Sequence, residues 1–211
     1  MRKQKQRGRF LVLDGPDGAG KSTQIALLAQ ALQARGMRVL VLREPGGTKA
    51  GEAIRAILLD RRTEGLSPLT ETFLFEAARA QLVQAVIQPA LRSGTWVLCD
   101  RFTLSTLVYQ GLAGGLKPDM VARLSRLATG SLRPDRYLVL WVRLTEGLTR
   151  RSGREADRME SKGLRFSRAV SEAYRQQARM HPRRYILVDG SGTVERVRAR
   201  VWARVVRLLD C

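Results

Sequence analysis

The sequence predicts a three-layer α/β/α fold in which helices cover both faces of a five-stranded parallel sheet. Short apolar runs rich in β-branched and aromatic residues alternate along the chain with longer segments of helical period. Such alternation is typical of repeated β-α-β units, whose parallel strands are buried on both faces. With 211 residues, 44% of them hydrophobic, the chain is long enough for one domain with a substantial core.

Each expected strand is a short apolar run that ends at polar or turn-forming residues. The five runs lie at residues 10–13, 39–42, 96–99, 137–142 and 185–188. Helical periodicity fills the segments 22–34, 50–59, 68–91, 104–109, 118–128, 165–180 and 194–209. We expect a basic disordered arm at residues 1–9 and a single domain at residues 10–211. Within that domain the polar, arginine-rich segment 144–163 has little apolar periodicity, and we expect it to form a mobile lid.

Composition narrows the possible classes of protein. No apolar run approaches the roughly 18 residues that a membrane-spanning helix needs. The basic start lacks the long apolar segment and cleavage site of a signal peptide, so we expect a cytoplasmic protein. Cys99 and Cys211 are the only cysteines, which argues against a disulfide framework and against a zinc site.

The chain carries a large positive charge. Its 38 lysines and arginines outnumber its 19 acidic residues, which gives a net charge of +19. A surface of this kind favours non-specific contact with nucleic acid at low salt. The alternative is a compositional excess of arginine that is spread over a solvated surface and serves no partner.

The strongest functional signal follows the first expected strand. A glycine-rich segment there matches the pattern G-x-x-x-x-G-K-[S/T] of a P-loop, and an amphipathic helix comes next. The segment consists of Gly15, Pro16, Asp17, Gly18, Ala19, Gly20, Lys21, Ser22 and Thr23. Its glycines allow backbone N–H groups to surround phosphate oxygens at the positive end of the helix. Lys21 would add a charge at the β- and γ-phosphates, and the hydroxyl of Ser22 would ligate Mg²⁺, so we expect ATP and Mg²⁺ as co-substrate and metal.

Asp100 and Arg101 follow the third expected strand, at the carboxyl edge where open α/β sheets bind ligands. The carboxylate of Asp100 can hold the Mg²⁺ shell, and the guanidinium of Arg101 can bind two oxygens of an acceptor phosphate. A strand-end ion pair is the structural alternative. A nucleoside monophosphate suits the acceptor role because its phosphate, with a second pKa of about 6, is already largely ionised and needs no general base. His181, the one histidine, lies outside these motifs and fits a surface position.

The order of the motifs resembles the thymidylate kinase family, whose members phosphorylate dTMP to dTDP with ATP and Mg²⁺. The motifs are DGPDGAGKSTQ at 14–24, REPGGT at 43–48, LFEAAR at 74–79, DRFTLSTLVYQG at 100–111, LRPD at 132–135 and READRME at 154–160. The resemblance extends from residue 10 to the last expected helix, and the motifs are specific in combination. It implies a P-loop kinase fold and a homodimer formed through apolar helix faces such as that of 69–91.

The resemblance also implies roles for residues on the acceptor side. Phe75 matches the aromatic residue that stacks on thymine, and Arg79, four residues later on the same helix face, matches the arginine at the base edge. Without the resemblance, the charge of Arg79 indicates a surface position. Asp17 matches the carboxylate that binds the 3′-hydroxyl, and Tyr109 matches the residue that crowds the 2′ position. The remaining expected acceptor contacts are Arg101 at the dTMP phosphate, with Arg43, Pro45, Thr106 and Gln110 around the nucleotide.

Gly18 stands where some family members have a basic residue, so the chain resembles the bacterial-type subgroup that supplies arginines from the lid. Arg154 is expected to reach the transferring phosphoryl group as an arginine finger, with Arg151 as the alternate. The alternative is that the lid arginines belong to the general excess of arginine. Glu160 matches an acid of the metal shell in some relatives.

The sequence thus predicts transfer of the γ-phosphoryl group of ATP to dTMP. Two other functions stay open at this point. One is another P-loop nucleotide or deoxynucleoside kinase. A deoxynucleoside kinase requires a carboxylate base near the 5′-hydroxyl. The other is a basic nucleic-acid-binding ATPase, which would bind polymer in a salt-dependent way.

Overall fold

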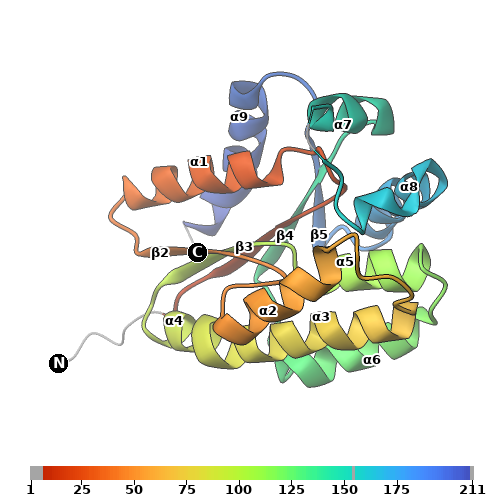
Figure 1. The fold of residues 1–211 in the computed structure, drawn as a ribbon. Coiled ribbons are helices and arrows are strands. Elements are labelled where there is room, and N and C mark those ends of the chain that lie inside the picture. The colour runs from red at the N-terminus through yellow and green to blue at the C-terminus, as the bar shows by residue number, and fades with distance from the viewer. Residues whose placement is uncertain (1–6, 154, 210–211) are drawn as a thin grey trace.

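A five-stranded parallel sheet forms the centre of the molecule (Figure 1). The computed structural model describes residues 7–153 and 155–209. The strands are β1 (Phe10–Asp14), β2 (Val39–Arg43), β3 (Trp96–Asp100), β4 (Arg136–Trp141) and β5 (Tyr185–Asp189), in the order β2-β3-β1-β4-β5. The central strand β1 pairs Val12 with Cys99 of β3 and with Tyr137 of β4. The predicted fold class and all five predicted strands are confirmed, each within one residue at either end.

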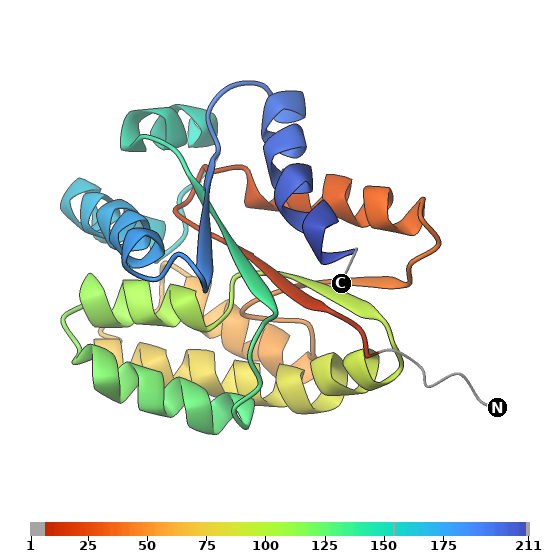
Figure 2. The ribbon, with the colours of Figure 1, turned by 180° about the vertical axis from the view of Figure 1, so that it is seen from behind.

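Helices cover the sheet on both faces (Figures 1 and 2). One face carries α1 (Lys21–Gln33) and α9 (Val194–Val205). The other carries α3 (Pro68–Leu82) and α8 (Leu164–Met180), with shorter helices between them. The remaining helical segments are α2 (Lys49–Leu59), η1 (Val83–Ile87), α4 (Gln88–Arg92), α5 (Thr103–Thr106), η2 (Leu107–Leu112), α6 (Pro118–Thr129), α7 (Leu144–Arg151), η3 (Glu160–Lys162) and η4 (Val206–Leu208).

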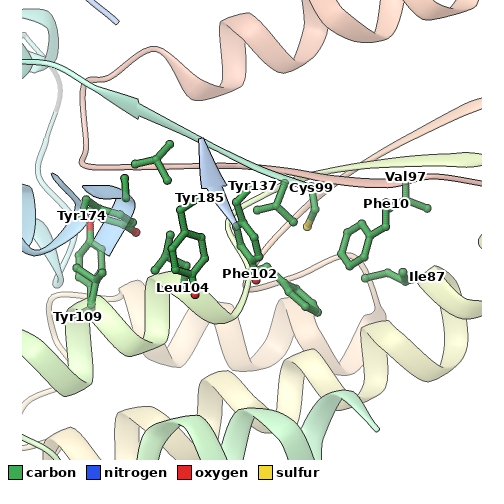
Figure 3. Packing of buried hydrophobic residues seen from close by; sticks show 14 of the residues in the cluster. Phe10, Ile87, Val97, Cys99, Phe102, Leu104, Tyr109, Tyr137, Tyr174 and Tyr185 are labelled. Carbon is green, nitrogen blue, oxygen red and sulfur yellow. The ribbon is translucent and has the colours of Figure 1, made fainter. Parts of the chain in front are cut away.

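The alternation of side chains along β1 divides the core into two clusters. Phe10 and Val12 face the layer of α3 and α8, whereas Leu11 and Leu13 face α1 and α9. Phe10 packs edge-on against Phe102, with 5.0 Å between the ring centroids, as the close view of this cluster shows (Figure 3). Because strand residues point alternately to opposite faces, a continuous apolar run is what a strand buried on both faces requires.

Two predicted helices contain π-helical segments that the periodicity did not indicate. The expected helix 68–91 is α3, then η1, then α4, and the expected helix 104–109 is α5 extended by η2 to Leu112. Pro89 follows η1 and has no N–H to donate, which removes one bond from the α-helical ladder at this point. The second π-helical segment contains Tyr109 and Gln110 and lies at the cleft described below.

The predicted lid is more structured than its composition indicated. Its first part, Leu144–Arg151, is helix α7, and Glu160–Lys162 form a 3₁₀ turn. The helix was missed because its eight residues offer only two large apolar side chains, Leu144 and Leu148. Its Gly147 lies against the backbone of the P-loop, where a Cβ at Gly18 would be 2.2 Å from the Gly147 carbonyl oxygen.

The first described residues are part of the fold. The N–H of Gly8 donates to Leu91 O at 2.9 Å, and Arg9 forms an ion pair with Asp135 at 3.5 Å. Residues 1–6 lie outside the described residues, so the expectation of a disordered arm stays a prediction for them. Within residues 7–153 and 155–209, no helix is both long enough and apolar enough to cross a membrane. The cytoplasmic location also stays a prediction.

Candidate active site

A cleft of about 820 Å³ opens at the carboxyl ends of the central strands. It is bounded by the P-loop, the loop after β2, helix α3, the segment from β3 to η2, the lid and the loop after β5. Seven of the described lining residues are cations and five are acids, which suits a ligand rich in phosphate. The cations are Lys21, Arg43, Arg55, Arg79, Arg101, Arg150 and Arg151, and the acids are Asp17, Glu44, Asp100, Asp157 and Glu160.

Most of the predicted site residues meet in this cleft. They are Asp17, Gly18, Ala19, Gly20, Lys21, Ser22, Thr23, Arg43, Pro45, Phe75, Arg79, Asp100, Arg101, Thr106, Tyr109, Gln110, Arg151 and Glu160. Gly15 and Pro16 are not among its lining residues and build the turn beneath it. Arg154 lies outside the described residues.

The P-loop takes a conformation that requires glycine. Gly15 has φ +137°, and a Cβ there would lie 2.0 Å from the carbonyl oxygen of Leu140. Gly20, with φ +88°, leads into α1, so the first N–H groups of the helix face the cleft. Lys21 is buried, and its Nζ donates to Pro16 O at 2.9 Å. Burial and the neighbouring charge of Arg101 lower the pKa of Lys21.

Ser22 and Asp100 form a pair of oxygen ligands at the start of α1. Ser22 Oγ donates to Asp100 Oδ2 at 2.7 Å. Asp100 Oδ1 is buried and has no hydrogen-bond partner among the described residues. A hydroxyl and a carboxylate with an unused oxygen fit the donor set of Mg²⁺. Glu160 pairs instead with Arg151 at 3.2 Å, and the described residues contain no cluster of three potential metal-ligating side chains.

Asp17 joins the P-loop to the segment from β3 to η2. Its Oδ1 accepts a hydrogen bond from the guanidinium of Arg101, and its Oδ2 accepts from the hydroxyl of Tyr109 at 2.8 Å. Burial acts to raise the pKa of Asp17, but the charges of Arg101 and Lys21 outweigh it and hold the pKa well below its usual range. Asp17 is therefore an ionised acceptor of hydrogen bonds at neutral pH.

Arg101 is held by several partners. Its backbone has φ +72°, an uncommon conformation for a residue with a side chain. Its Nη1 donates to Gly15 O at 3.1 Å, to Ser105 Oγ at 3.2 Å and to the hydroxyl of Tyr174 at 3.1 Å. The same hydroxyl donates to Asp14 Oδ1 at 2.7 Å. These bonds fix the guanidinium before any ligand binds.

Arg79 contradicts the surface position that its charge alone indicated. It is 1% exposed, and it pairs with Glu44 at 2.7 Å and with Glu76 at 2.6 Å. Two carboxylates compensate the buried charge, which is the condition under which proteins bury arginine. Burial raises the pKa of Glu44 to about 7, despite the opposing effect of Arg79.

Two polar side chains of α5 and η2 each have an oxygen that makes no hydrogen bond within the described part of the chain. Thr106 Oγ1 and Gln110 Oε1 are buried and have no hydrogen-bond partner among the described residues. Both residues line the cleft, as does Phe75 of α3. In the loop after β2, Arg43 pairs with Glu52 at 3.3 Å, and Pro45 O accepts from Arg55 at 2.9 Å.

The lid arginines have different partners. Arg150 donates to the carbonyl oxygens of Gly190 at 3.0 Å and Gly192 at 3.3 Å and pairs with Glu146 at 2.6 Å, so it fastens α7 to the loop after β5. Arg151 faces the cleft and pairs with Glu160. Arg158 binds elsewhere, at Glu71 of α3.

Sequence reasoning missed several residues of the cleft. The loop after β5 was overlooked although its sequence Asp-Gly-Ser-Gly-Thr at 189–193 stands at the carboxyl end of a strand, where ligands bind. Arg55 carried no local signal, and neither did Tyr174, whose hydroxyl binds Arg101, because their positions depend on packing between distant segments.

Comparison with known proteins agrees with this geometry. Residues 13–201 match the family described as thymidylate kinase. A thymidylate kinase of Symbiobacterium thermophilum is 46% identical over 200 residues, which cover 95% of this chain and 94% of that protein. One of Rhodopseudomonas palustris is 44% identical over 212 residues, covering 96% and 90%, and one of Pelobacter propionicus is 44% identical over 207 residues, covering 95% and 94%. The chain belongs to the thymidylate kinase family.

Proposed function

We propose that this cleft holds ATP on the P-loop side and dTMP on the side of α3 and η2. As a member of the thymidylate kinase family, the chain is an ATP-dependent nucleoside monophosphate kinase that converts dTMP to dTDP. The observation that carries the assignment of the two sides is the position of Asp17. This P-loop carboxylate binds both Arg101 and Tyr109, so the two substrates' phosphates would meet beside it.

On the donor side, backbone N–H groups from Asp17 to Thr23 surround the phosphates of ATP. Lys21 lies beside them as a buried charge, and Arg150 and Arg151 of the lid face the same part of the cleft. Ser22 and Asp100 would hold Mg²⁺, which supplies charge neutralisation on the phosphate oxygens when bound. The unused Oδ1 of Asp100 supports this assignment.

On the acceptor side, Arg101 binds the phosphate of dTMP. Phe75 stacks on thymine, Thr106 and Gln110 offer their unused acceptor atoms to the base, and Arg79 closes the pocket between its two carboxylates. Asp17 and Tyr109 contact the deoxyribose, and Arg43 and Pro45 form the wall opposite.

Catalysis follows from position and charge rather than from a general base. The phosphate of dTMP is already an oxyanion at neutral pH, so the residues must align it and neutralise the charge that is shared during transfer. Lys21, Arg101 and Arg151 supply positive charge around that point. The role of Arg154 as arginine finger and that of Glu160 in the metal shell stay predictions.

We also propose that two copies of the chain associate through the outer helical layer. Large apolar side chains are exposed there on three neighbouring helices: Ile57 of α2, Leu69 and Phe73 of α3 and Leu127 of α6. Phe73 is 53% exposed, although it lies two residues before the cleft residue Phe75. An exposed apolar area across adjacent helices is typical of an interface.

The first experiment measures ADP formation from ATP and Mg²⁺ with dTMP, dUMP, UMP, CMP, AMP, GMP or thymidine as acceptor. We expect rapid turnover with dTMP. Arg101→Ala should reduce kcat/KM for dTMP about a thousandfold, because it removes a charge that binds the acceptor phosphate. Arg179→Ala, an exposed arginine of α8, is the matched control and should have no effect.

Other outcomes would redirect the assignment. Turnover with a different monophosphate or with thymidine would keep the P-loop assignment and refute the roles of Phe75, Arg79 and Tyr109. Turnover that depends on a nucleic-acid polymer instead would favour a nucleic-acid-binding ATPase. Contact with nucleic acid is otherwise expected to be non-specific and sensitive to salt.

A further inference from the structure

Glu71 of α3 is a buried carboxylate that contacts two other parts of the molecule. It is 1% exposed. Its Oε1 accepts from Arg158 at 2.8 Å and from Lys162 at 2.7 Å, and its Oε2 accepts from Lys162 at 2.8 Å and from Gln110 Nε2 at 3.0 Å. Burial acts to raise the pKa of Glu71, but the hydrogen bonds from Lys162 and Gln110 outweigh it and lower the pKa. The group is therefore ionised at neutral pH.

An ionised carboxylate fixes which way the amide of Gln110 points. A carboxylate can only accept hydrogen bonds, so the amide nitrogen must face Glu71. The amide oxygen must then point away from Glu71, and it is this oxygen that is buried without a partner among the described residues. Gln110 lines the cleft, and Thr106, one helical turn earlier, also has an unused hydroxyl oxygen there.

This orientation selects among bases. Thymine and uracil carry a donor N–H at N3, whereas neutral cytosine carries an acceptor nitrogen at the same position. An acceptor oxygen held toward the ring accepts from the N3–H of thymine or uracil and repels the N3 lone pair of cytosine. A buried polar group left without its complement is the strongest source of discrimination between similar substrates.

The same carboxylate holds part of the lid. Arg158 reaches Glu71 with Nη1, and its Nε donates to Leu58 O at 2.8 Å. Its backbone N–H donates to Leu59 O at 3.1 Å. The lid segment 157–162 is thereby tied to the end of α2 and to α3, which carries Phe75 and Arg79.

We propose that Glu71 is a positioning residue for base specificity, which orients the Gln110 amide so that its oxygen faces the base while also anchoring lid residues Arg158 and Lys162. The inference rests on the proposed function, in which the base lies against Gln110. Glu71 acts through Gln110 and the lid and does not itself contact the substrate.

The test compares kcat/KM for dTMP and dCMP in Glu71→Gln. A glutamine at 71 can donate as well as accept, so the amide of Gln110 is able to turn its nitrogen toward the base. We expect the preference for dTMP over dCMP to fall about tenfold or more. The double variant Glu71→Gln/Lys162→Met keeps the net charge of the cluster, so it provides a second test if Glu71→Gln alone folds poorly. The ratio of kcat/KM for dTMP to that for dCMP should fall equally in it.

Two controls separate this effect from a loss of structure. Lys162→Met alone leaves the bond between Glu71 and Gln110 in place, so its ratio should stay within about twofold of the starting chain. In a Gln110→Ala background, Glu71→Gln should cause no further change in the ratio, because the amide through which it acts is gone.

An unchanged ratio in both Glu71 variants, or an equal fall in the Gln110→Ala background, would overturn the inference while leaving the proposed function intact. A starting chain that does not phosphorylate dTMP would instead refute the proposed function and this inference with it.

Discussion

The donor side and the acceptor side of the cleft are built from different chemical groups. The donor side is mostly backbone: glycines of the P-loop, the first turn of α1 and the glycine-containing loop after β5. The acceptor side is mostly charged side chains: the buried Arg79 between Glu44 and Glu76, and the half-buried pair of Asp17 and Arg101. A backbone cradle is encoded by a few neighbouring residues, whereas a buried charge network needs partners from distant segments.

This difference indicates where each side is vulnerable. Every triphosphate presents similar oxygens, so a cradle of N–H groups suffices for the donor. A particular monophosphate must be distinguished by its base and sugar, which requires polar side chains in a dry pocket. Changes on the acceptor side should therefore cost folding stability as well as affinity, and changes on the donor side should cost affinity alone.

The largest expected effect is that of Arg79→Met. The substitution leaves Glu44 and Glu76 buried without their common counter-charge, and we expect the free energy of unfolding to fall by about 4 kcal/mol at neutral pH. Urea denaturation measures this change. Arg175→Met, which removes a half-exposed pair on α8, is the control and should cost less than about 0.5 kcal/mol. Equal losses in the two variants would contradict the contrast between the sides.

The acceptor side should also make stability depend on pH. The pKa of Glu44 is about 7 in the folded chain against 4.5 for the ordinary group. Between these values the folded chain binds more protons than the unfolded chain, so stability falls as pH rises, by up to about 3 kcal/mol. Denaturation at pH 5, 6, 7 and 8 should show this fall in the starting chain and not in Glu44→Gln. Parallel pH profiles of the free energy of unfolding in the two chains would refute this prediction.

Tyr174→Phe tests the bonds that hold Arg101. It removes a hydroxyl that donates to Asp14 and accepts from Arg101. We expect KM for dTMP to rise about tenfold, with KM for ATP unchanged, because the affected guanidinium faces the acceptor. Tyr137→Phe, which loses a comparable bond to Thr103, is the control and should change neither constant. A parallel rise in both constants would show that Tyr174 has only a general structural role.

The smallest expected effect is on the donor side. In Gly147→Ala, the new methyl group would lie 2.9 Å from the carbonyl oxygen of Asp17, so α7 must move away from the P-loop. We expect KM for ATP to rise about threefold while KM for dTMP and the unfolding midpoint stay unchanged. Thr145→Ala, on the exposed side of α7, is the control. A loss of stability like that of Arg79→Met would remove the distinction between the two sides.

The same contrast explains what could be predicted from the sequence. The strands and most helices follow from local periodicity, and the P-loop follows from nine adjacent residues. The position of Arg79 did not follow from its own residue type, because its two carboxylates come from the loop after β2 and from α3. Only the resemblance to a family placed it in the cleft.

Helix α7 and the partners of Glu71 were also beyond local reasoning. Helix α7 is eight residues long, and its only large apolar side chains are Leu144 and Leu148, which are too few for periodicity to identify a helix. Glu71 is a polar residue in the first turn of α3, which fits a solvated position equally well. Its burial depends on Arg158 and Lys162, about ninety residues further along the chain.

The contact between Gly18 and Gly147 has a consequence for how this enzyme type can diverge. A side chain at position 18 and a lid helix seated directly on the P-loop exclude each other sterically, since the Cβ would overlap a backbone oxygen. A basic residue at position 18 therefore cannot be added to this chain while Gly147 of α7 packs against the P-loop. A basic side chain in the P-loop and a lid helix packed on the P-loop are therefore alternatives, and an evolutionary change from one to the other must alter both positions together.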